Sequence, residues 1–305
     1  MKWFNNILAK VVPIMPKWSV SLVAKKYIAG VTLEETIQEI KKLNAYNFLA
    51  TTDVFGESIP DIESAEKPVN YYLELLDSLK KEQLNSGISV KLSQLRLTID
   101  EQKAWKNFQK VLTKAKENDI FLRIDMEDSP WTDKTIGFYQ RARDEYEKTG
   151  TVIQSYLFRS ENDIKELIFD GQTNLRICKG IYKEPADISF QNKKEISDNF
   201  FNLVKLCLVN DAFVGIATHD LQFINRCEKY ITDNKIPNDK YEFQTLLGVP
   251  IIKTLKRLIS EGHNVRYYVP FGSDWYPYSM CRLKENPDIA GYVFKDFFKI
   301  NKENT

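Results

Sequence analysis

The sequence predicts one α/β domain folded as a (β/α)8 barrel of the TIM type, with extra helices at its N-terminus. Short runs rich in β-branched residues alternate with longer, charged amphipathic segments, and this alternation implies parallel strands joined by helices. Eight such runs can be read along the chain, which favours a closed barrel over an open sheet. The length of 305 residues suits a single barrel domain.

The expected strands follow one another at regular intervals. They span residues 47–53, 88–93, 120–127, 152–157, 174–180, 213–220, 241–248 and 265–272. Most of the segments between them are amphipathic; in residues 102–117, apolar side chains recur at helical spacing at Trp105, Phe108, Val111 and Leu112. We expect a single domain over residues 1–305, with a helical arm at about 1–45 and the barrel at about 46–300.

The composition is that of an ordinary globular protein. Lysine and arginine (43) nearly balance aspartate and glutamate (42), so the charge favours neither a nucleic-acid partner nor a disordered segment. The two histidines are far apart in sequence, so no multi-histidine metal site is expected. The cysteines form no CxxC pair and indicate reduced thiols in a cytoplasmic protein; they are Cys178, Cys207, Cys227 and Cys281.

The N-terminal segment MKWFNNILAKVVPIMPKW is apolar but is interrupted by Lys10, Pro13, Pro16 and Lys17. It is too short and too broken to span a bilayer. Two roles stay open for it: packing against the outside of the barrel, which we favour, and an interfacial helix that lies on a membrane. We therefore expect a cytoplasmic protein whose membrane contact, if it has any, is peripheral and at the inner face.

Polar side chains gather at the ends of the expected strands. In a parallel barrel the C-terminal strand ends meet on one face, where barrel enzymes carry their active sites. A strand end can also mark nothing more than the return of the chain to solvent. The convergence from all eight strands favours a site; the residues are Asp53, Lys91, Ser93, Asp125, Glu127, Gln154, Arg176, Lys179, Thr218, His219, Asp220, Gln244 and Tyr268.

Several of these segments, taken in order, resemble the strand motifs of the proline dehydrogenase family. They are SVKLS (89–93), RIDME (123–127), VIQSYL (152–157), RICKGIYKEP (176–185), IATHD (216–220) and YEFQTLLG (241–248). The last strand and the substrate-binding helix of that family resemble RYYVPFGSDWYPY (266–278) and RLKENP (282–287). The resemblance covers most of the chain, and its specificity lies in the order of the motifs.

The resemblance implies a monofunctional flavoprotein that oxidises L-proline to 1-pyrroline-5-carboxylate with FAD and passes the electrons to a membrane quinone. It implies that Asp125 and Arg176 are catalytic, and that Glu57 and Glu285 gate or flank the site. The implied substrate ligands are Lys91, Tyr268, Tyr278 and Arg282, with Cys281 beside them. The implied FAD contacts are Met126, Gln154, Lys179, Gly180, Ile181, Thr218 and His219.

These residue types suit that chemistry. A guanidinium such as that of Arg176 stays charged at all working pH values, so it stabilises the negative charge that a reduced flavin ring acquires. Lys91 lies within an apolar strand, where a lysine has either an anionic partner, with Asp125 as the structural candidate, or a function such as binding the substrate carboxylate. Proline must lose a proton from its amine, and the carboxylates around Asp125 are candidates to help; the sequence does not identify the base.

The match is broken at one position. The family carries two adjacent arginines three and four residues after the tyrosine that aligns with Tyr278, and here the first of them is Cys281. Losing one charge-assisted hydrogen bond to a carboxylate costs about 1.5–3 kcal/mol. We therefore expect an intact flavin site with weakened proline binding, or another cyclic amino acid as substrate.

Three other functions remain open on the same barrel. One is a Schiff-base aldolase that uses Lys91 or Lys179 and has no flavin. Another is a non-catalytic flavin-binding protein, and the third is a barrel reductase that takes its hydride from NADH. Colour in the purified protein and its response to proline distinguish them.

Overall fold

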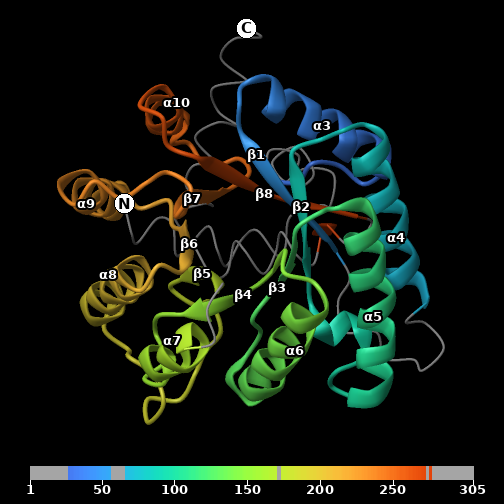
Figure 1. Cartoon of the computed structure of the whole chain (residues 1–305), viewed down its shortest axis with the longest axis horizontal. Helices are drawn as coiled ribbons and strands as arrows, with labels where there is room; N and C mark the ends of the chain where they lie inside the picture. Colours follow the sequence, from blue (N-terminus) through green and yellow to red (C-terminus); the bar gives the residue numbers. More distant parts are fainter. Residues whose placement is uncertain (1–26, 56–65, 170–172, 273–274, 277–305) are drawn as a thin grey trace, which may run out of the picture.

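A computed structural model describes residues 27–55, 66–169, 173–272 and 275–276 of the chain. Over these residues the fold is a closed barrel with strand order β1-β2-β3-β4-β5-β6-β7-β8, and all eight neighbouring pairs are parallel. The helices lie around the outside of the strands (Figure 1). The expected (β/α)8 fold is confirmed.

The strands are β1 (Leu49–Val54), β2 (Ser86–Val90), β3 (Leu122–Ile124), β4 (Thr149–Gln154), β5 (Asn174–Cys178), β6 (Phe213–Ala217), β7 (Tyr241–Leu246) and β8 (Val265–Phe271). The helices are α3 (Leu33–Ala45), α4 (Glu66–Lys81), α5 (Glu101–Asn118), α6 (Thr132–Glu145), α7 (Ser160–Phe169), α8 (Lys193–Val209), α9 (Leu221–Asp233) and α10 (Ile252–Ser260), with 3-10 turns η3 (Leu92–Leu95) and η4 (Ser129–Trp131). Helix α3 falls within the expected N-terminal arm, and residues 1–26 of that arm lie outside the described residues.

The helices begin and pack as their sequences dictate. In α3, Thr32 and Glu35 form a reciprocal capping box that satisfies the first backbone N–H groups. In α5, Asp100 accepts a hydrogen bond from the backbone of Lys103, which caps that helix in the same way. The expected apolar face of α5 is fully confirmed, because Trp105, Phe108, Val111 and Leu112 are all buried.

The barrel contains two kinds of interior. Between the strands and the helices lies the apolar core, which includes Tyr72, Phe108, Phe138 and Phe200, each no more than 1% exposed. Enclosed by the ring of strands lies a second interior, which carries charged side chains toward the N-terminal ends of the strands. Arg123 of β3 and Glu242 of β7 are each 2% exposed. Because a buried charge is costly unless it is paired or hydrogen-bonded, this second interior needs an internal network of partners.

The expected strands all exist, but most of them end earlier than predicted. Lys91 follows β2 at the residue before η3, and Asp125 to Glu127 follow β3. Similarly, Lys179 follows β5 and Thr218 follows β6. The polar residues at these points lie beyond the strand ladder, at the C-terminal mouth of the barrel, which is therefore the candidate site.

Candidate active site

Asp125 is the centre of a buried hydrogen-bond network at the C-terminal ends of the strands. Its Oδ1 accepts from Arg176 Nη1 at 2.8 Å and from Ser89 Oγ at 2.9 Å. Its Oδ2 accepts from the Tyr268 hydroxyl at 2.9 Å. Three strands and the loop after β3 therefore fix the position of one carboxylate.

Lys91 forms an ion pair with Asp53, whose side chain is fully buried at the end of β1. A structural ion pair with Asp125 was the alternative to a substrate-binding role for Lys91, and the ion-pair partner in the described residues is Asp53 instead. The parallel register of β1 and β2 places Asp53 beside Ser89, so Lys91, two residues further on, lies within reach of the β1 carboxylate. Lys91 Nζ is also 3.4 Å from the Tyr268 hydroxyl, which joins this ion pair to the Asp125 network.

The two buried carboxyl groups have pKa values shifted in opposite directions. Burial raises the pKa of Asp53 above its usual value, and the nearby Lys91 only partly offsets it. Burial also raises the pKa of Asp125, but the positive charges of Arg176 and Lys91, together with the hydrogen bonds from Tyr268 and Ser89, outweigh that effect, so the net pKa is lowered. Asp125 is therefore an ionised hydrogen-bond acceptor at neutral pH, whereas Asp53 is the carboxyl group that takes up a proton more readily.

Arg176 is held by three side chains. Its Nε donates to Gln244 Oε1 at 2.6 Å, its Nη1 donates to Asp125, and its Nη2 donates to Ser89 Oγ at 3.3 Å. The guanidinium carbon lies 5.3 Å from the centre of the Tyr268 ring, within the range of a cation–π contact. Of its five N–H groups, two have no partner among the described residues.

Gln154, at the end of β4, presents an acceptor at the same mouth. Its Nε2 donates to the backbone oxygen of Glu127 at 3.2 Å. Its Oε1 is buried and has no hydrogen-bond partner among the described residues. A buried acceptor without a partner is costly, so this atom is suited to a ligand that carries an N–H group.

Glu127 is anchored by Ser93. The backbone N–H of Ser93 donates to Glu127 Oε2 at 2.9 Å, and its hydroxyl donates to Oε1 at 2.5 Å. Burial raises the pKa of Glu127 in spite of these hydrogen bonds. The loops that follow β2 and β3 are thereby tied together beside Lys91.

Lys179 and Gly180 follow β5, as expected of a strand-end pair. Lys179 Nζ is 3.3 Å from Asp220 Oδ2 and 4.7 Å from the centre of the Phe223 ring. Gly180 has a φ of 97°, and an added Cβ would lie 2.3 Å from the Tyr156 ring. The close approach that a glycine allows here is thus to Tyr156, a reason for glycine that involves no cofactor.

The remaining residues that were inferred to contact a cofactor differ in exposure. Met126 is buried at 7% exposure and Ile181 is exposed at 47%. Thr218 is half-buried and its hydroxyl accepts from the backbone N–H of Asp220, while His219 is exposed. The five inferred residues Glu57, Tyr278, Cys281, Arg282 and Glu285 lie outside the described residues.

Ser89 and Glu242 belong to the network but were not named as site residues from the sequence, whereas Gln244 was expected among the polar strand ends. Ser89 and Gln244 contact Arg176 directly, and below them Glu242 accepts hydrogen bonds from Gln244 and Arg266. The signal that could have found Glu242 is period-two alternation, because Glu242 and Gln244 lie two residues apart on one strand. Side chains two apart on a strand face the same side.

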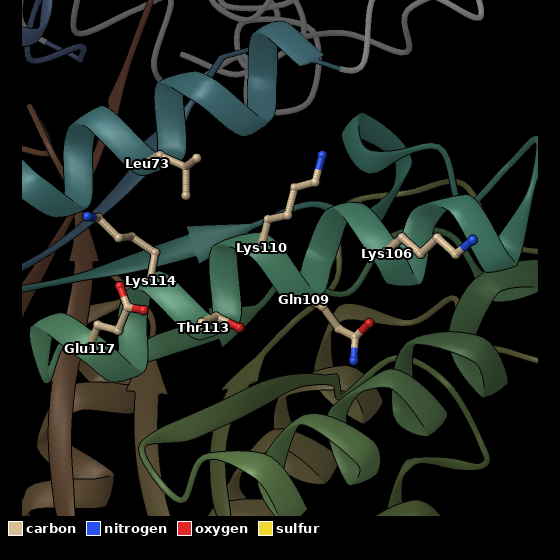
Figure 2. A pocket seen from close by; sticks show the side chains of 7 residues that line it. All are labelled: Leu73, Lys106, Gln109, Lys110, Thr113, Lys114 and Glu117. Carbon is tan, nitrogen blue, oxygen red and sulfur yellow. The ribbon is translucent and has the colours of Figure 1, made fainter.

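Two other features of the described residues lie away from this mouth. A groove on the outside of the barrel is lined by Leu73 of α4 and by residues of α5 (Figure 2). Its charges are mixed and partly paired: Lys114 Nζ is 2.6 Å from Asp77 Oδ1, and Gln109 donates to Glu145. The groove therefore shows no convergence of polar groups like that at the strand ends.

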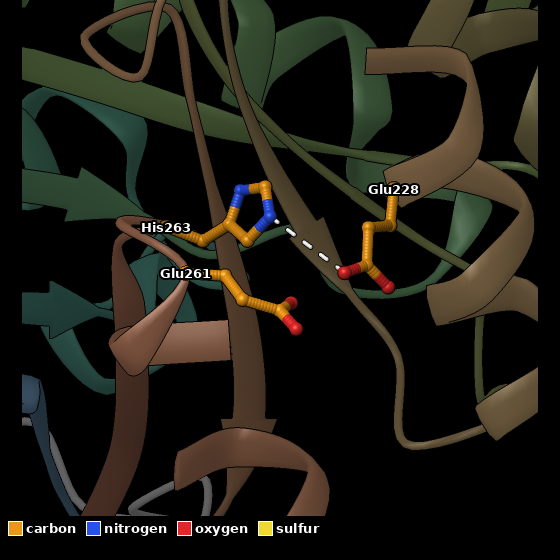
Figure 3. Close-up of side chains that lie close together, drawn as sticks. All are labelled: Glu228, Glu261 and His263. Atoms are coloured by element: carbon orange, nitrogen blue, oxygen red, sulfur yellow. Dashed lines mark ion pairs between the residues drawn. The ribbon is translucent and has the colours of Figure 1, made fainter. Parts of the chain in front are cut away.

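A cluster of Glu228, Glu261 and His263 has the residue types of a metal site (Figure 3). Arg257 forms ion pairs with both carboxylates, including one of 2.7 Å from its Nη2 to Glu228 Oε2. His263 Nδ1 is 2.7 Å from the Tyr241 hydroxyl, and burial lowers the His263 pKa. Because Arg257 already forms ion pairs with both carboxylates, the cluster is an ion-pair network. His263 lies before the start of β8, at the opposite end of that strand from Tyr268.

None of the helices in the described part of the chain is both long and apolar enough to cross a membrane.

Comparison with known proteins gives concordant matches. A family model described as proline dehydrogenase matches residues 36–294. Proline dehydrogenase 1 of Bacillus subtilis (strain 168) is 35% identical over 276 residues, which are 90% of this chain and 91% of the relative. Proline dehydrogenase of Deinococcus radiodurans is 31% identical over 281 residues, which are 90% of each chain.

Solved structures agree on the fold. Proline utilization A (PutA) from Bdellovibrio bacteriovorus, inactivated by N-propargylglycine, has a TM-score of 0.81 and 24% sequence identity. The match covers 87% of this chain and 32% of that one, so this chain spans about a third of the PutA chain. A PutA variant from Bradyrhizobium japonicum has a TM-score of 0.73, with 19% identity over 86% of this chain and 30% of that one.

Proposed function

The chain belongs to the proline dehydrogenase family and is an oxidoreductase that acts on proline, and we propose that it oxidises L-proline to 1-pyrroline-5-carboxylate with FAD at the C-terminal mouth of its barrel. The observation that carries this proposal is the joined network of Lys91, Asp53, Tyr268, Asp125 and Arg176. It brings fixed cations, an ionised carboxylate and an aromatic side chain into one place, and these groups suit the binding and oxidation of a small amino acid.

The described residues fit a flavin. Arg176 has two N–H groups without a partner among the described residues, and Gln154 has one buried acceptor without one. Lys179 and the backbone after β5 offer a cation and N–H groups for the phosphates. When bound, FAD supplies the acceptor for the hydride that leaves the ring carbon beside the proline nitrogen.

The residues of the chain itself position the substrate and provide fixed charges beside it. Arg176 is a fixed positive charge whose orientation is set before any ligand arrives, so no energy is spent on reorganising it during the reaction. Lys91, Tyr268, Tyr278 and Arg282 are the substrate contacts that we propose. The Tyr268 hydroxyl donates to Asp125 and lies 3.4 Å from Lys91 Nζ, and the aromatic ring of Tyr268 offers an apolar face suited to a small saturated ring.

The proton of the substrate amine needs an acceptor, and the pKa shifts indicate which carboxyl group is better suited. The lowered pKa of Asp125 makes it a weak base, whereas the pKa of Asp53 is raised by burial. Asp53 is in direct contact with Lys91. We therefore assign the proton-accepting role to the Asp53 and Lys91 pair, and the role of fixed charge to Asp125.

The Schiff-base aldolase reading fits the site less well. A lysine must be neutral to attack a carbonyl group, and the ion pair with the buried Asp53 favours the charged form of Lys91.

The partners that we propose are L-proline as substrate and a quinone as the electron acceptor. Contact with a membrane, where such a quinone resides, would be peripheral. This places the protein at the first, oxidative step of proline catabolism.

An anaerobic titration with L-proline tests the proposal. The purified protein, supplied with FAD, is titrated while the visible absorbance of the flavin is followed. We expect the absorbance to bleach, with a concentration dependence that reports proline affinity. A protein that binds FAD and is not bleached by proline, but is bleached by NADH, would be a reductase instead, and one that fails to bind FAD at all would contradict the cofactor assignment.

A further inference from the structure

A chain of polar side chains runs down the inside of the barrel from Arg176 to its lower part. Arg176 Nε donates to Gln244 Oε1 at 2.6 Å, and Gln244 Nε2 donates to Glu242 Oε1 at 2.5 Å. Arg266 Nε donates to the same Glu242 oxygen at 2.6 Å. Glu242 lies two residues before Gln244 on β7, about 7 Å lower along the strand.

Glu242 decides which way the Gln244 amide points. The two ends of a glutamine amide have nearly the same shape, so hydrogen-bond partners set their orientation. An ionised carboxylate can only accept, which forces Gln244 to turn its NH2 group down toward Glu242. The amide oxygen then faces up, where it accepts from Arg176 Nε.

The charged form of Glu242 is itself maintained by its surroundings. Burial raises the Glu242 pKa, but Arg266, Arg123 and the hydrogen bond from Gln244 together outweigh it, so the net pKa is lowered. Arg266 is anchored in turn, since its Nη1 donates to the backbone oxygen of Ala50 on β1 at 2.6 Å. The chain therefore ends on the strand pair β1 and β8, which closes the barrel.

The neighbouring strand leaves room for this arrangement only because it carries a glycine. A Cβ added to Gly215 of β6 would lie 2.5 Å from Gln244 Nε2 and 2.9 Å from its Cδ. Any side chain at this position would displace the amide. Gly215 is paired with Glu242 in the strand register.

We propose that Glu242 is a positioning residue for proline oxidation, because it fixes the Gln244 amide and so fixes the plane of the Arg176 guanidinium toward the flavin. The inference rests on the proposed function for its catalytic meaning. The coupling between Glu242 and Arg176 that it requires can be measured without flavin or substrate.

The principal variant is Glu242→Gln, which keeps the shape and removes the acceptor-only character. Its matched control is Glu228→Gln, which removes a carboxylate from the Arg257 ion pair at the far end of the barrel. We expect Glu242→Gln to bind FAD with normal stoichiometry. We expect its flavin to have a more negative midpoint potential, and the rate of reduction at saturating proline to fall on the order of 10-fold, with little change in the half-saturating concentration.

The swapped double variant Glu242→Gln with Gln244→Glu provides a rescue. It places an acceptor-only group directly against Arg176 Nε and leaves the total charge unchanged. We expect it to recover most of the lost rate and potential. The inference is overturned if Glu242→Gln matches Glu228→Gln in both measurements, or if the swap is no better than the single variant.

Unfolding measurements separate this inference from the proposed function. In the protein without flavin, a double-mutant cycle between Glu242→Gln and Arg176→Met should be non-additive, although the two side chains do not touch, and additivity would overturn the inference. A wild-type protein that proline does not reduce would overturn the proposed function while the cycle still decides the coupling. If Glu242→Gln does not fold, Gly215→Ala takes its place in these measurements, because an added Cβ at Gly215 displaces the same Gln244 amide. A Gly215→Ala protein that matches Glu228→Gln in flavin potential and reduction rate would then overturn the inference.

Discussion

Asp125 and Asp53 show how two identical side chains at one barrel mouth acquire pKa shifts of opposite direction. Asp125 accepts hydrogen bonds from Arg176, Ser89 and Tyr268, so its charge is neutralised locally and its pKa is lowered. Among the described residues, Asp53 has one cationic partner, Lys91, and its side chain is fully buried. The difference arises from the number of donors that each register brings within reach.

The lowered pKa of Asp125 predicts a pH-dependent contribution to stability. A carboxyl group whose pKa is depressed in the folded state contributes stability above its unfolded pKa, which is about 3.9, and this contribution is lost as the pH falls through the folded pKa. Asp125→Asn should therefore be less stable than wild type at pH 7, with a difference that shrinks below about pH 4. Urea unfolding of both proteins across this range measures it; a difference that stays constant with pH would contradict the assignment.

Cys281 predicts weak proline binding. Cys281→Arg restores a cation for the substrate carboxylate, and one charge-assisted hydrogen bond of about 1.5–3 kcal/mol corresponds to a tightening of about 10- to 150-fold. The measurement is the anaerobic flavin titration with proline. Cys281→Ser is the control and should leave the affinity unchanged, and an arginine variant that binds proline no more tightly than the serine variant would contradict the prediction.

The sequence indicated many of the residues that gather at the candidate site, but it did not indicate which side chains contact one another. Arg176 and Asp125 were both inferred, and they are in contact at 2.8 Å. The partner of Lys91 was missed, because which carboxylate it reaches depends on a register between β1 and β2 that one sequence does not reveal. Gln244 was expected at the mouth, but its partner Glu242 was missed, because positions deep inside a strand are usually apolar.

Strand ends are the elements where prediction and structure differ most. All eight predicted strands exist, but β3 comprises only Leu122–Ile124, whereas residues 120–127 were expected. At the mouth, residue types that are typical of strands continue past the last residue that pairs with a neighbouring strand. Only the neighbouring strand determines where the ladder stops, so the boundary cannot be read from local composition.

Two glycines in different elements predict opposite effects of the same substitution. Gly180, in the loop after β5, has a positive φ and contacts the Tyr156 ring, so Gly180→Ala should destabilise the protein by more than about 1 kcal/mol. Gly137 lies within α6 with no atom within 4 Å of an added Cβ, so Gly137→Ala should stabilise by about 0.5–1 kcal/mol. Thermal and urea unfolding of the two variants test this, and equal shifts of the same sign would contradict it.

At the scale of the whole molecule, the closed barrel could be predicted from the number of alternating strand and helix units in the sequence. Eight alternating strand and helix units leave few arrangements other than a ring. What the count could not provide is the charged interior of the barrel. Arg123, with a pKa lowered to about 9 chiefly by burial, is surrounded by backbone and amide acceptors from β4 and β5 that only the closed barrel assembles.

Two thiols report on the integrity of that assembly. Cys207 of α8 and Cys227 of α9 are no more than 1% exposed, and burial raises the pKa of each to about 12. We expect neither to react with a thiol reagent at pH 8 until the protein unfolds globally. Peptide mapping after labelling, native and in urea, measures this; labelling of either cysteine in the native protein would show that its helix detaches from the barrel on its own.

The seam of the barrel has a consequence for how the protein is made. β1 pairs with β8 over six residue pairs, from Leu49 with Arg266 to Val54 with Phe271. A ribosome adds about 5–20 residues per second, so β1 waits on the order of 10 to 40 seconds for its partner to be synthesised. During that interval the nascent chain carries an open sheet edge, which could pair with a strand of another chain. When β8 is synthesised and pairs with β1, the barrel closes and that edge is removed.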